Sequence, residues 1–379
     1  MPLMNNSILH IGASKCGSSS LQSLLTQHPD LTASDGTMYR YACADRSGKL
    51  VTGPKLTQMG AKSVFGYCSS PDIGPGVDAL SMFAGIGPKI AKITDQGELP
   101  ILSSEGWALR GDIFRDNQLL ESSGLHPHVI LFLRPPMDWL NSAWWQWGAW
   151  TGHPVERWAT RSLHNVEWAN MIESWQTVPG VHQLTVRLTS INVVDQFFDL
   201  LDLPTIPQKR NNVGLSPEML YFLHRNQQYR PGPHEPQVEF SVARWTTFSG
   251  KSAPWVIPKN IVKSLLAKNE AQTRKLLTLV GAKEREMIEN DPRWWDPAAY
   301  DDRKVITEAD YSGQESREVL MADLLGGLAT AQEALGMDPD LGEHPATAGT
   351  VTDANIAAVL DDLLVLDNTF RRRNPSVAP

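Results

Sequence analysis

A glycine-bounded turn between an apolar run and a helical pattern is the feature of this sequence that most constrains its fold. The run Ser7–Ile11 predicts a buried strand, and the pattern of Ser19–Thr26 predicts a helix. Gly12 and Gly17 bound the turn between them, in the stretch GASKCG. A strand, a glycine-rich turn and a helix in this order are typical of a parallel α/β sheet, and a turn at a helix N-terminus can bind phosphate.

The position of the lysine separates this turn from an ATP-binding loop. In the pattern G-x-x-x-x-G-K-[ST] the lysine follows the second glycine, whereas here Ser18 follows it and the lysine of the turn is Lys15. Backbone N–H groups and the helix dipole would still bind an anion, and the hydroxyls of residues 18–20 can add donors. We find no strand ending in aspartate as a second magnesium site, so we expect phosphate binding without a metal. The alternative is an ordinary glycine turn with a solvated lysine.

Further along the chain, apolar runs alternate with helical patterns. Strands are expected at 99–103, 128–133 and 184–188, and helices at 78–93, 139–150 and 193–201. This alternation predicts a three-layer α/β/α fold with a central parallel sheet, and the glycine turn after its first strand makes the expected fold similar to that of P-loop NTPases. We expect an α/β domain over 1–310, with an irregular insertion at about 32–75, and a C-terminal helical extension over 311–379 with helices at 315–335 and 353–371.

Composition excludes several classes of protein. The net charge of −8 argues against a general nucleic-acid binder. Cys16, Cys43 and Cys68 fit neither a zinc site nor an even disulfide framework, which favours a reduced, cytoplasmic protein. We see no signal peptide, and no apolar stretch reaches the roughly 18 residues of a membrane helix.

The stretch HIGASKCGSSSLQ resembles the 5′-phosphosulfate-binding loop of sulfotransferases, which runs roughly G-x-x-K-x-G-[TS]-[TS]-x-L. The matching residues are Gly12, Lys15, Gly17, Ser18, Ser19 and Leu21. Cys16 departs from the usual threonine or serine, and its place near a helix N-terminus would lower the pKa of its thiol. The resemblance implies that 3′-phosphoadenosine 5′-phosphosulfate (PAPS) is the donor and that its 5′ end is bound by Ser14, Lys15, Cys16, Gly17, Ser18, Ser19 and Ser20.

A second element of this family binds the 3′-phosphate through an arginine and a serine eight residues apart. The stretch LFLRPPMDWLNS offers Arg134 and Ser142 at that spacing. Arg134 follows the strand 128–133 at its carboxyl end, where open α/β sheets bind ligands, and its guanidinium suits a dianionic phosphate. A weaker similarity is KRNN, where Arg210 matches an Arg-x-Asn element that bacterial members carry near the nucleotide. Together the similarities cover roughly 7–30 and 99–225.

Transfer of a sulfuryl group to a hydroxyl needs a cation at the oxygen that bridges sulfur and phosphorus, and a base for the incoming hydroxyl. We assign Lys15 to that oxygen. Members of the family use histidine or glutamate as the base, and Glu105, at the carboxyl end of the strand 99–103, is our candidate. Its alternative is a solvated carboxylate or a partner for Arg110. His10 is a second candidate, with a packed strand histidine as its alternative.

The acceptor is not encoded in a recognisable motif. Sulfotransferases of bacteria often act on carbohydrates, and a hydroxylated lipid, a small metabolite or an amine is also open. Trp144, Trp147 and Trp150 are spaced by three, which predicts one helical stripe that either packs in the core or lines an acceptor site. Two other functions remain open: a P-loop kinase that uses ATP, and a non-catalytic nucleotide-binding protein of the same fold. The late helices could also form a homodimer.

Overall fold

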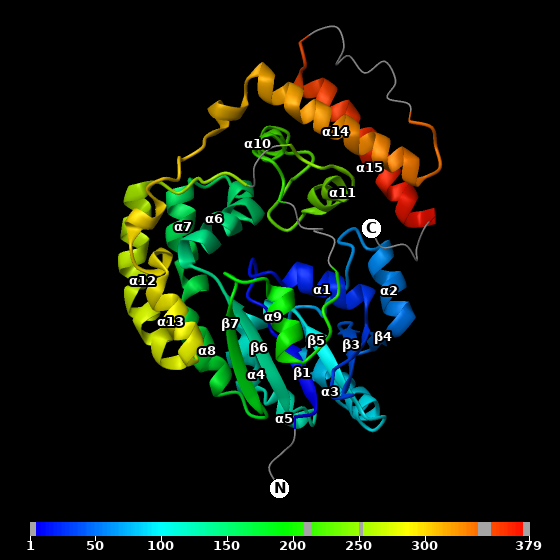
Figure 1. The fold of residues 1–379 in the computed structure, drawn as a ribbon, viewed down its shortest axis with the longest axis vertical. Coiled ribbons are helices and arrows are strands. Elements are labelled where there is room, and N and C mark those ends of the chain that lie inside the picture. Colours follow the sequence, from blue (N-terminus) through cyan, green and yellow to red (C-terminus); the bar gives the residue numbers. More distant parts are fainter. Residues whose placement is uncertain (1–4, 208–213, 250–252, 340–349, 374–379) are drawn as a thin grey trace.

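The computed structural model describes residues 5–207, 214–249, 253–339 and 350–373. Its centre is a 7-stranded sheet in the order β2-β3-β5-β1-β6-β7, with β4 paired to β3 (Figure 1). The strands are β1 (Ser7–His10), β2 (Asp30–Thr32), β3 (Met38–Ala44), β4 (Leu50–Thr52), β5 (Glu98–Ser103), β6 (Pro127–Leu133) and β7 (Gln183–Leu188). Strands β3, β5, β1, β6 and β7 run parallel, and only β2 and β4 are antiparallel to β3.

The middle of the sheet is covered on both faces. In β1, Leu9 lies between Leu102 of β5 and Val129 of β6, and all three side chains are buried. The apolar run of β6 is buried from Val129 to Leu133, as expected for a strand that has helices on both sides. The fold is therefore α/β, with a mostly parallel central sheet flanked by helices, as the sequence predicts.

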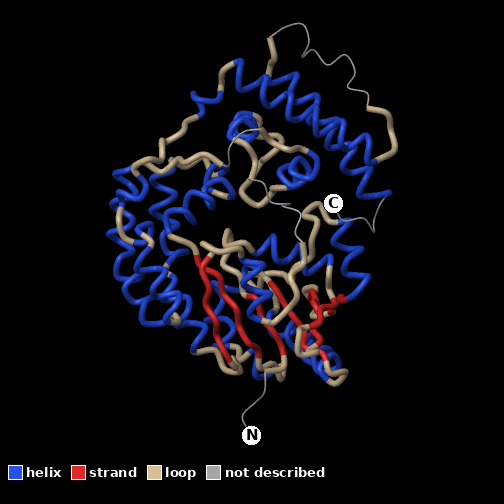
Figure 2. Tube along the Cα trace, in the orientation of Figure 1, coloured by secondary structure: helices blue, strands red, loops and turns tan. Residues whose placement is uncertain are grey.

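The flanking helices fall into two groups that surround the strands (Figure 2). One group is α1 (Ser18–Gln27), α2 (Gly53–Lys62) and α9 (Val193–Leu200); the other is α3 (Ala79–Thr94), α4 (Gly111–Asp116), α5 (Leu119–Ser122) and α8 (Trp168–Gln176). Helices α6 (Pro136–Gln146), α7 (Val155–Ser162), α12 (Lys259–Leu279) and α13 (Ala282–Asn290) extend the molecule beyond β7.

A helical layer lies over the carboxyl edge of the sheet (Figure 1). It consists of α10 (Pro217–Arg225), α11 (Gln237–Trp245), α14 (Gln314–Ala334) and α15 (Asp353–Arg373). The long helices α14 and α15 pack against each other and onto α11, and α15 also reaches α2. We call these four helices the cap. None of the helices in the described ranges is both long enough and apolar enough to cross a membrane.

Two predictions about local structure are wrong. The segment 32–75 is not irregular, because it contains β3, which pairs in parallel with β5, as well as β4 and α2. Its many glycines form turns between these elements: Gly36 and Gly48 have φ of +88° and +73°. The helix expected over 139–150 ends at Gln146, and Trp147 leaves the helical conformation with φ −132° and ψ −49°. The three tryptophans of the expected stripe therefore do not share one helical face. The two late helices are confirmed as α14 and α15, whereas the domain boundary at 310 remains a prediction.

Candidate nucleotide site

The turn between β1 and α1 has a left-handed backbone at three positions. Gly12, Lys15 and Gly17 have φ of +28°, +61° and +88°, and Gly17 is the N-cap of α1. A Cβ at Gly17 would lie 2.7 Å from Val193 Cγ2, so the close approach of α9 also requires glycine there. Lys15 has a side chain, so its left-handed backbone conformation costs free energy. Strained residues of this kind are concentrated at functional sites. The backbone conformation of the turn therefore sets the direction of its N–H groups and of the Lys15 side chain.

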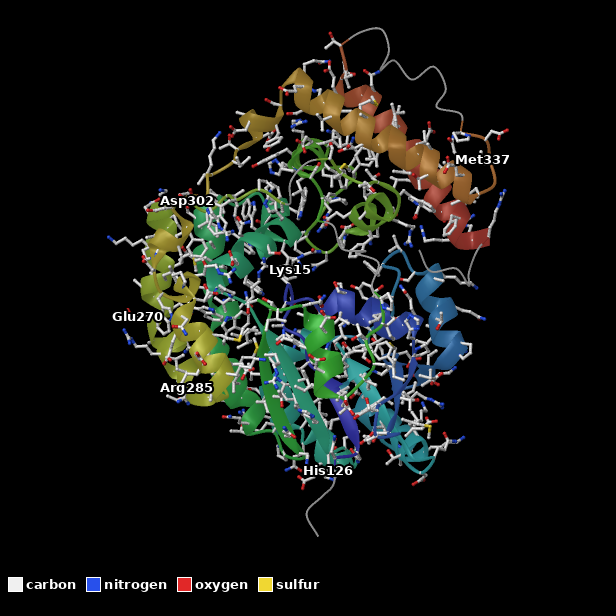
Figure 3. The ribbon with its side chains drawn as sticks, in the orientation of Figure 1. Lys15, His126, Glu270, Arg285, Asp302 and Met337 are labelled. Carbon is white, nitrogen blue, oxygen red and sulfur yellow. The ribbon has the colours of Figure 1, made fainter. Side chains whose placement is uncertain are left out.

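The turn borders a cavity of about 1160 Å³ at the carboxyl edge of the sheet. Lys15 lies between the sheet and the helices of the cap, as the labelled side chain in Figure 3 shows. The wall formed by the α/β core contains Lys15, Gly17, Ser19, Ser20, Arg134 and residues 189–193; the facing wall contains residues 64–67 and, from α11, Glu239, Phe240, Ala243 and Arg244. In open α/β sheets, ligands bind at this carboxyl edge.

Lys15 is held by a neutral partner. Its Nζ donates to Gln146 Oε1 at 3.2 Å, and no described carboxylate lies within ion-pair distance of it. Desolvation by burial lowers the pKa of the Lys15 amine and the nearby Arg134 lowers it further, while Glu105 and Glu239 act in the opposite direction. A buried ammonium group is stabilised when an anion binds, because the anion replaces the water that the ammonium group lost on burial.

Arg134 connects the loop after β6 to the turn after β1. Its Nη1 donates to the carbonyl of Lys15 at 3.3 Å, and its own carbonyl accepts from Trp168 Nε1 at 3.0 Å. Trp139 Nε1 donates to the carbonyl of Ser14 at 2.6 Å. In the part of the chain that the structure describes, Arg134 forms no ion pair. The structure therefore brings Lys15 and Arg134 together on one wall, with the charge of Arg134 uncompensated.

The loop serines do not all face the cavity. Ser18 is buried and its Oγ donates to Glu105 Oε1, which also accepts from Ser19 Oγ at 3.5 Å. Ser19 lies 3.4 Å from the hydroxyl of Tyr67. Arg110 pairs with Asp72 at 2.6 Å, so the alternative in which Glu105 is its partner is wrong. Of the serines 18–20, Ser19 and Ser20 border the cavity, whereas Glu105 does not, and the role of Glu105 as the base remains a prediction.

His10 is packed beneath the turn. It has no exposed surface, its Nδ1 lies 2.8 Å from Ser103 Oγ, and Phe132 and Phe197 contact its ring edge-on. Burial lowers the pKa of His10 to about 3, so the ring is neutral at ordinary pH. It lies outside the cavity wall. This geometry agrees with the packed-histidine alternative and gives His10 no access to a substrate.

Three more predicted site residues are Cys16, Ser142 and Arg210. Burial raises the pKa of the Cys16 thiol to about 12, so the lowering expected from the helix N-terminus is wrong. Ser142 is half-buried on α6 and does not border the cavity. Arg210 lies outside the described residues. The roles of Ser142 and Arg210 at the 3′-phosphate therefore remain predictions.

Sequence reasoning missed the residues that the cap contributes. Glu239 accepts from Arg230 Nε at 2.6 Å, and Arg230 is fully buried. Arg244, also buried, pairs with Asp367 of α15 at 2.8 Å. The apolar spacing of Val238, Val242 and Trp245 was the available signal for α11, but the flanking prolines and glycines obscured it.

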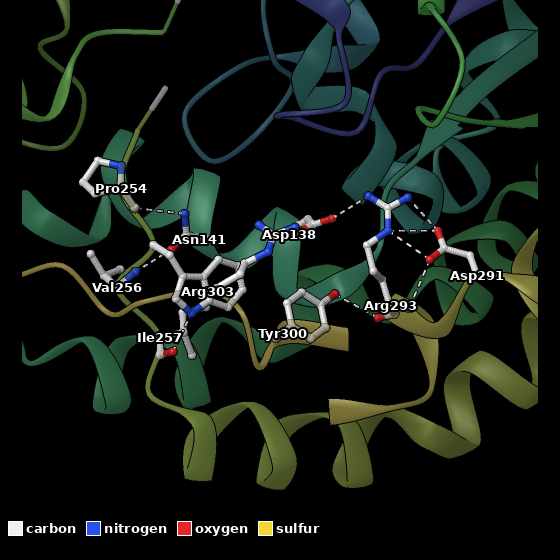
Figure 4. A network of polar contacts seen from close by, with 10 residues as sticks. Asp138, Asn141, Pro254, Val256, Ile257, Asp291, Arg293, Tyr300 and Arg303 are labelled. Carbon is white, nitrogen blue, oxygen red and sulfur yellow. Dashed lines mark hydrogen bonds and ion pairs between the residues drawn. The ribbon is translucent and has the colours of Figure 1, made fainter. Parts of the chain in front are cut away.

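An ion-pair network extends the wall behind Arg134 (Figure 4). Asp138 on α6 is buried and lies 3.1 Å from Arg293 Nη1 and 3.0 Å from Arg303 Nη2. Arg293 also pairs with Asp291 at 2.7 Å, and both Asp138 and Arg293 border the cavity. The network fixes the segment after α13 against the start of α6. It thereby supports the helix that carries Gln146.

Comparisons with known proteins add little to this geometry. No protein-family model matches the sequence, and no curated protein matches it. Among solved structures, the crystal structure of a sulfotransferase from Alicyclobacillus acidocaldarius is similar, at 15% identity and a TM-score of 0.32, over 75% of this chain and 99% of that chain. Because this score is low, the functional argument rests on the site alone. Fold and site define an α/β protein with a glycine-rich turn and two basic side chains, Lys15 and Arg134, at the carboxyl edge of the sheet.

Proposed function

We propose that this protein is a sulfotransferase that moves the sulfuryl group of PAPS to a hydroxyl or amine of an acceptor. One observation carries the proposal: a left-handed Lys15 ahead of Gly17 projects into the cavity, and Arg134, without an ion-pair partner among the described residues, is bonded to the carbonyl of that lysine. Ser18 stands where an ATP-binding loop has its lysine, and its side chain is turned to Glu105.

The chemistry follows from the placement of the charges. The amides of the turn and the hydroxyls of Ser19 and Ser20 would hold the 5′-phosphate at the N-terminus of α1. Lys15 would neutralise the charge that grows on the bridging oxygen as the bond to sulfur breaks, and Arg134 would bind the 3′-phosphate. Loss of a preorganised donor of this kind raises a barrier by about 3 kcal/mol. We expect the acceptor, a hydroxylated carbohydrate, lipid or small metabolite, to enter from the side of the cap.

Thermal unfolding with nucleotides tests the proposal. 3′-Phosphoadenosine 5′-phosphate (PAP), the product, should stabilise the protein by about 2.7 kcal/mol at a hundredfold excess over its Kd, whereas ATP and ADP with magnesium should have little effect. Arg134→Ala should abolish the preference for PAP, because only PAP carries the 3′-phosphate. Equal stabilisation by PAP and ATP, or magnesium-dependent turnover of ATP, would instead favour a kinase.

A further inference from the structure

Glu239 places a carboxylate on the cap wall of the cavity, facing the turn. It lies on α11, with a side chain that is 15% exposed, and it borders the cavity together with Lys15. One oxygen, Oε1, accepts from Arg230; no hydrogen bond involves the other oxygen among the described residues. Burial raises the pKa of the Glu239 carboxyl, while Arg230 and Lys15 act in the opposite direction. Lys15 and Glu239 are thus close enough to interact electrostatically.

Arg230 connects the two walls of the cavity. It is fully buried, and beyond its pair with Glu239 it donates to the carbonyls of Gly232 and, at 2.8 Å, of Gln146. Its guanidinium also lies 5.0 Å from the centre of the Trp150 ring. Because the side chain of Gln146 accepts from Lys15, a single buried arginine fixes the carboxylate and the partner of the lysine relative to each other.

Glu105 is in a different position. Its Oε1 accepts from the hydroxyls of Ser18 and Ser19, and it lies behind the turn rather than on the cavity wall. An acceptor hydroxyl in the cavity would meet Glu239 before it could reach Glu105. Glu239 is therefore placed to meet an acceptor in the cavity, whereas Glu105 is placed to hold the turn.

We propose that Glu239 is the base that takes the proton of the acceptor hydroxyl, and that Glu105 positions the turn. This inference rests on the proposed sulfuryl transfer. The acceptor oxygen bonds to sulfur as its proton passes to the Glu239 carboxylate. The bond from sulfur to the bridging oxygen breaks, and its electron pair stays on the 5′-phosphate beside Lys15. The products are a sulfate ester, PAP and protonated Glu239.

The surroundings of Glu239 suit an acceptor with an apolar ring. Phe240, the next residue on α11, meets Phe65 edge-on at 4.9 Å between ring centres, and Phe65 lies 6.1 Å from Tyr67. All three border the cavity. Such a wall can bury the flat face of a ring while its hydroxyl points to the carboxylate.

The test compares binding of PAP with turnover of PAPS in Glu239→Gln, and uses Glu235→Gln, on an exposed position before α11, as the matched control. Turnover is followed as PAP release with water, phenol, cyclohexanol and glucose as acceptors. We expect Glu239→Gln to lose turnover by at least roughly 100-fold while it binds PAP about threefold more tightly, because a negative charge near the phosphates is removed. The control should match wild type in both.

A merely structural role would weaken binding and turnover together, and that result would overturn the inference. Glu239→Asp keeps a charge for Arg230 but withdraws the carboxylate, so it should retain the stability of wild type and still lose most of the turnover. Wild-type turnover in Glu239→Gln, or no turnover by wild type with any of the four acceptors, would also overturn it. If wild type fails to bind PAP, the proposed function itself fails; if PAP binds and Glu239→Gln is fully active, only the role of Glu239 fails.

Discussion

The two walls of the cavity are held by different kinds of interaction. The wall of the α/β core owes its shape mainly to the main chain: parallel strands end at one edge, and Lys15 and Gly17 have the left-handed φ that curls the turn, while the Asp138–Arg293 ion pair supports the wall behind Arg134. The cap wall depends on buried charges: Arg230 with Glu239, and Arg244 with Asp367. The core wall should therefore fail when its backbone cannot adopt the required angles, and the cap wall when a buried arginine loses the group that accepts its hydrogen bonds.

Removal of Asp367 should have the largest effect on stability. This carboxylate has no exposed surface and accepts from Ser241, Arg244, Trp245 and Arg371 at 2.8–3.0 Å. Asp367→Ala leaves Arg244 buried without its partner, which costs about 3–5 kcal/mol. Chemical denaturation measures the loss, and Glu333→Ala, at an exposed position of α14, is the control.

The same variant separates the two walls. Arg244 also donates to the carbonyl of Val64 at 2.8 Å, so a loosened α11 should release the neighbouring wall segment, residues 64–67, as well. Hydrogen exchange should rise in α11 and at 64–67 and stay unchanged in β1 and β6. An equal rise of hydrogen exchange in both walls would show that they unfold as one unit, and would contradict the distinction between them.

The core wall could be predicted from sequence because its determinants are local. The strand β1, the glycine spacing and the helix α1 lie within a short stretch, and the apolar run of β6 identifies the strand that Arg134 follows. The cap could not be predicted in this way, since Arg244 finds Asp367 across 123 positions of sequence and the buried state of an arginine is not visible in its own neighbourhood. Strand β3 was missed for a related reason: it is a strand because β5 pairs with it.

The surroundings of Glu105 show the same limit within the site. The strand before it correctly predicts that Glu105 lies at the edge of the turn, but the side of the turn on which the carboxylate lies depends on Ser18, which is buried and donates to it. Glu239, on the opposite wall, belongs to a helix whose position is set by α14 and α15. The direction in which a side chain points across a cavity therefore depends on tertiary packing, which the local sequence does not show.

Gly17→Ala should have the next largest effect, and on the core wall. A residue with a side chain at φ +88° costs about 1–3 kcal/mol, and the added Cβ would also press on Val193. Gly36→Ala is a matched control, because Gly36 has the same φ of +88° with open space around it. The difference in unfolding free energy between the two variants measures the contact with α9. PAP affinity should fall in Gly17→Ala and not in Gly36→Ala, whereas equal losses would mean that the close packing of the turn is irrelevant to binding.

The smallest predicted effect is a pH dependence that comes from Lys15. Because desolvation lowers the pKa of this amine, the charged form is lost as pH rises through a range below that of an ordinary lysine. The affinity for PAP should therefore be greatest at neutral pH and decline on the alkaline side by about 1.5 kcal/mol, the contribution of one hydrogen bond to a charged group. Calorimetric titration above neutral pH, where the phosphates of PAP are already ionised, isolates the amine. Lys15→Arg keeps its charge over this range and should bind PAP with a flat profile. A decline of the same size in Lys15→Arg would assign the titration to another group and would remove Lys15 from the core wall's contacts with the nucleotide.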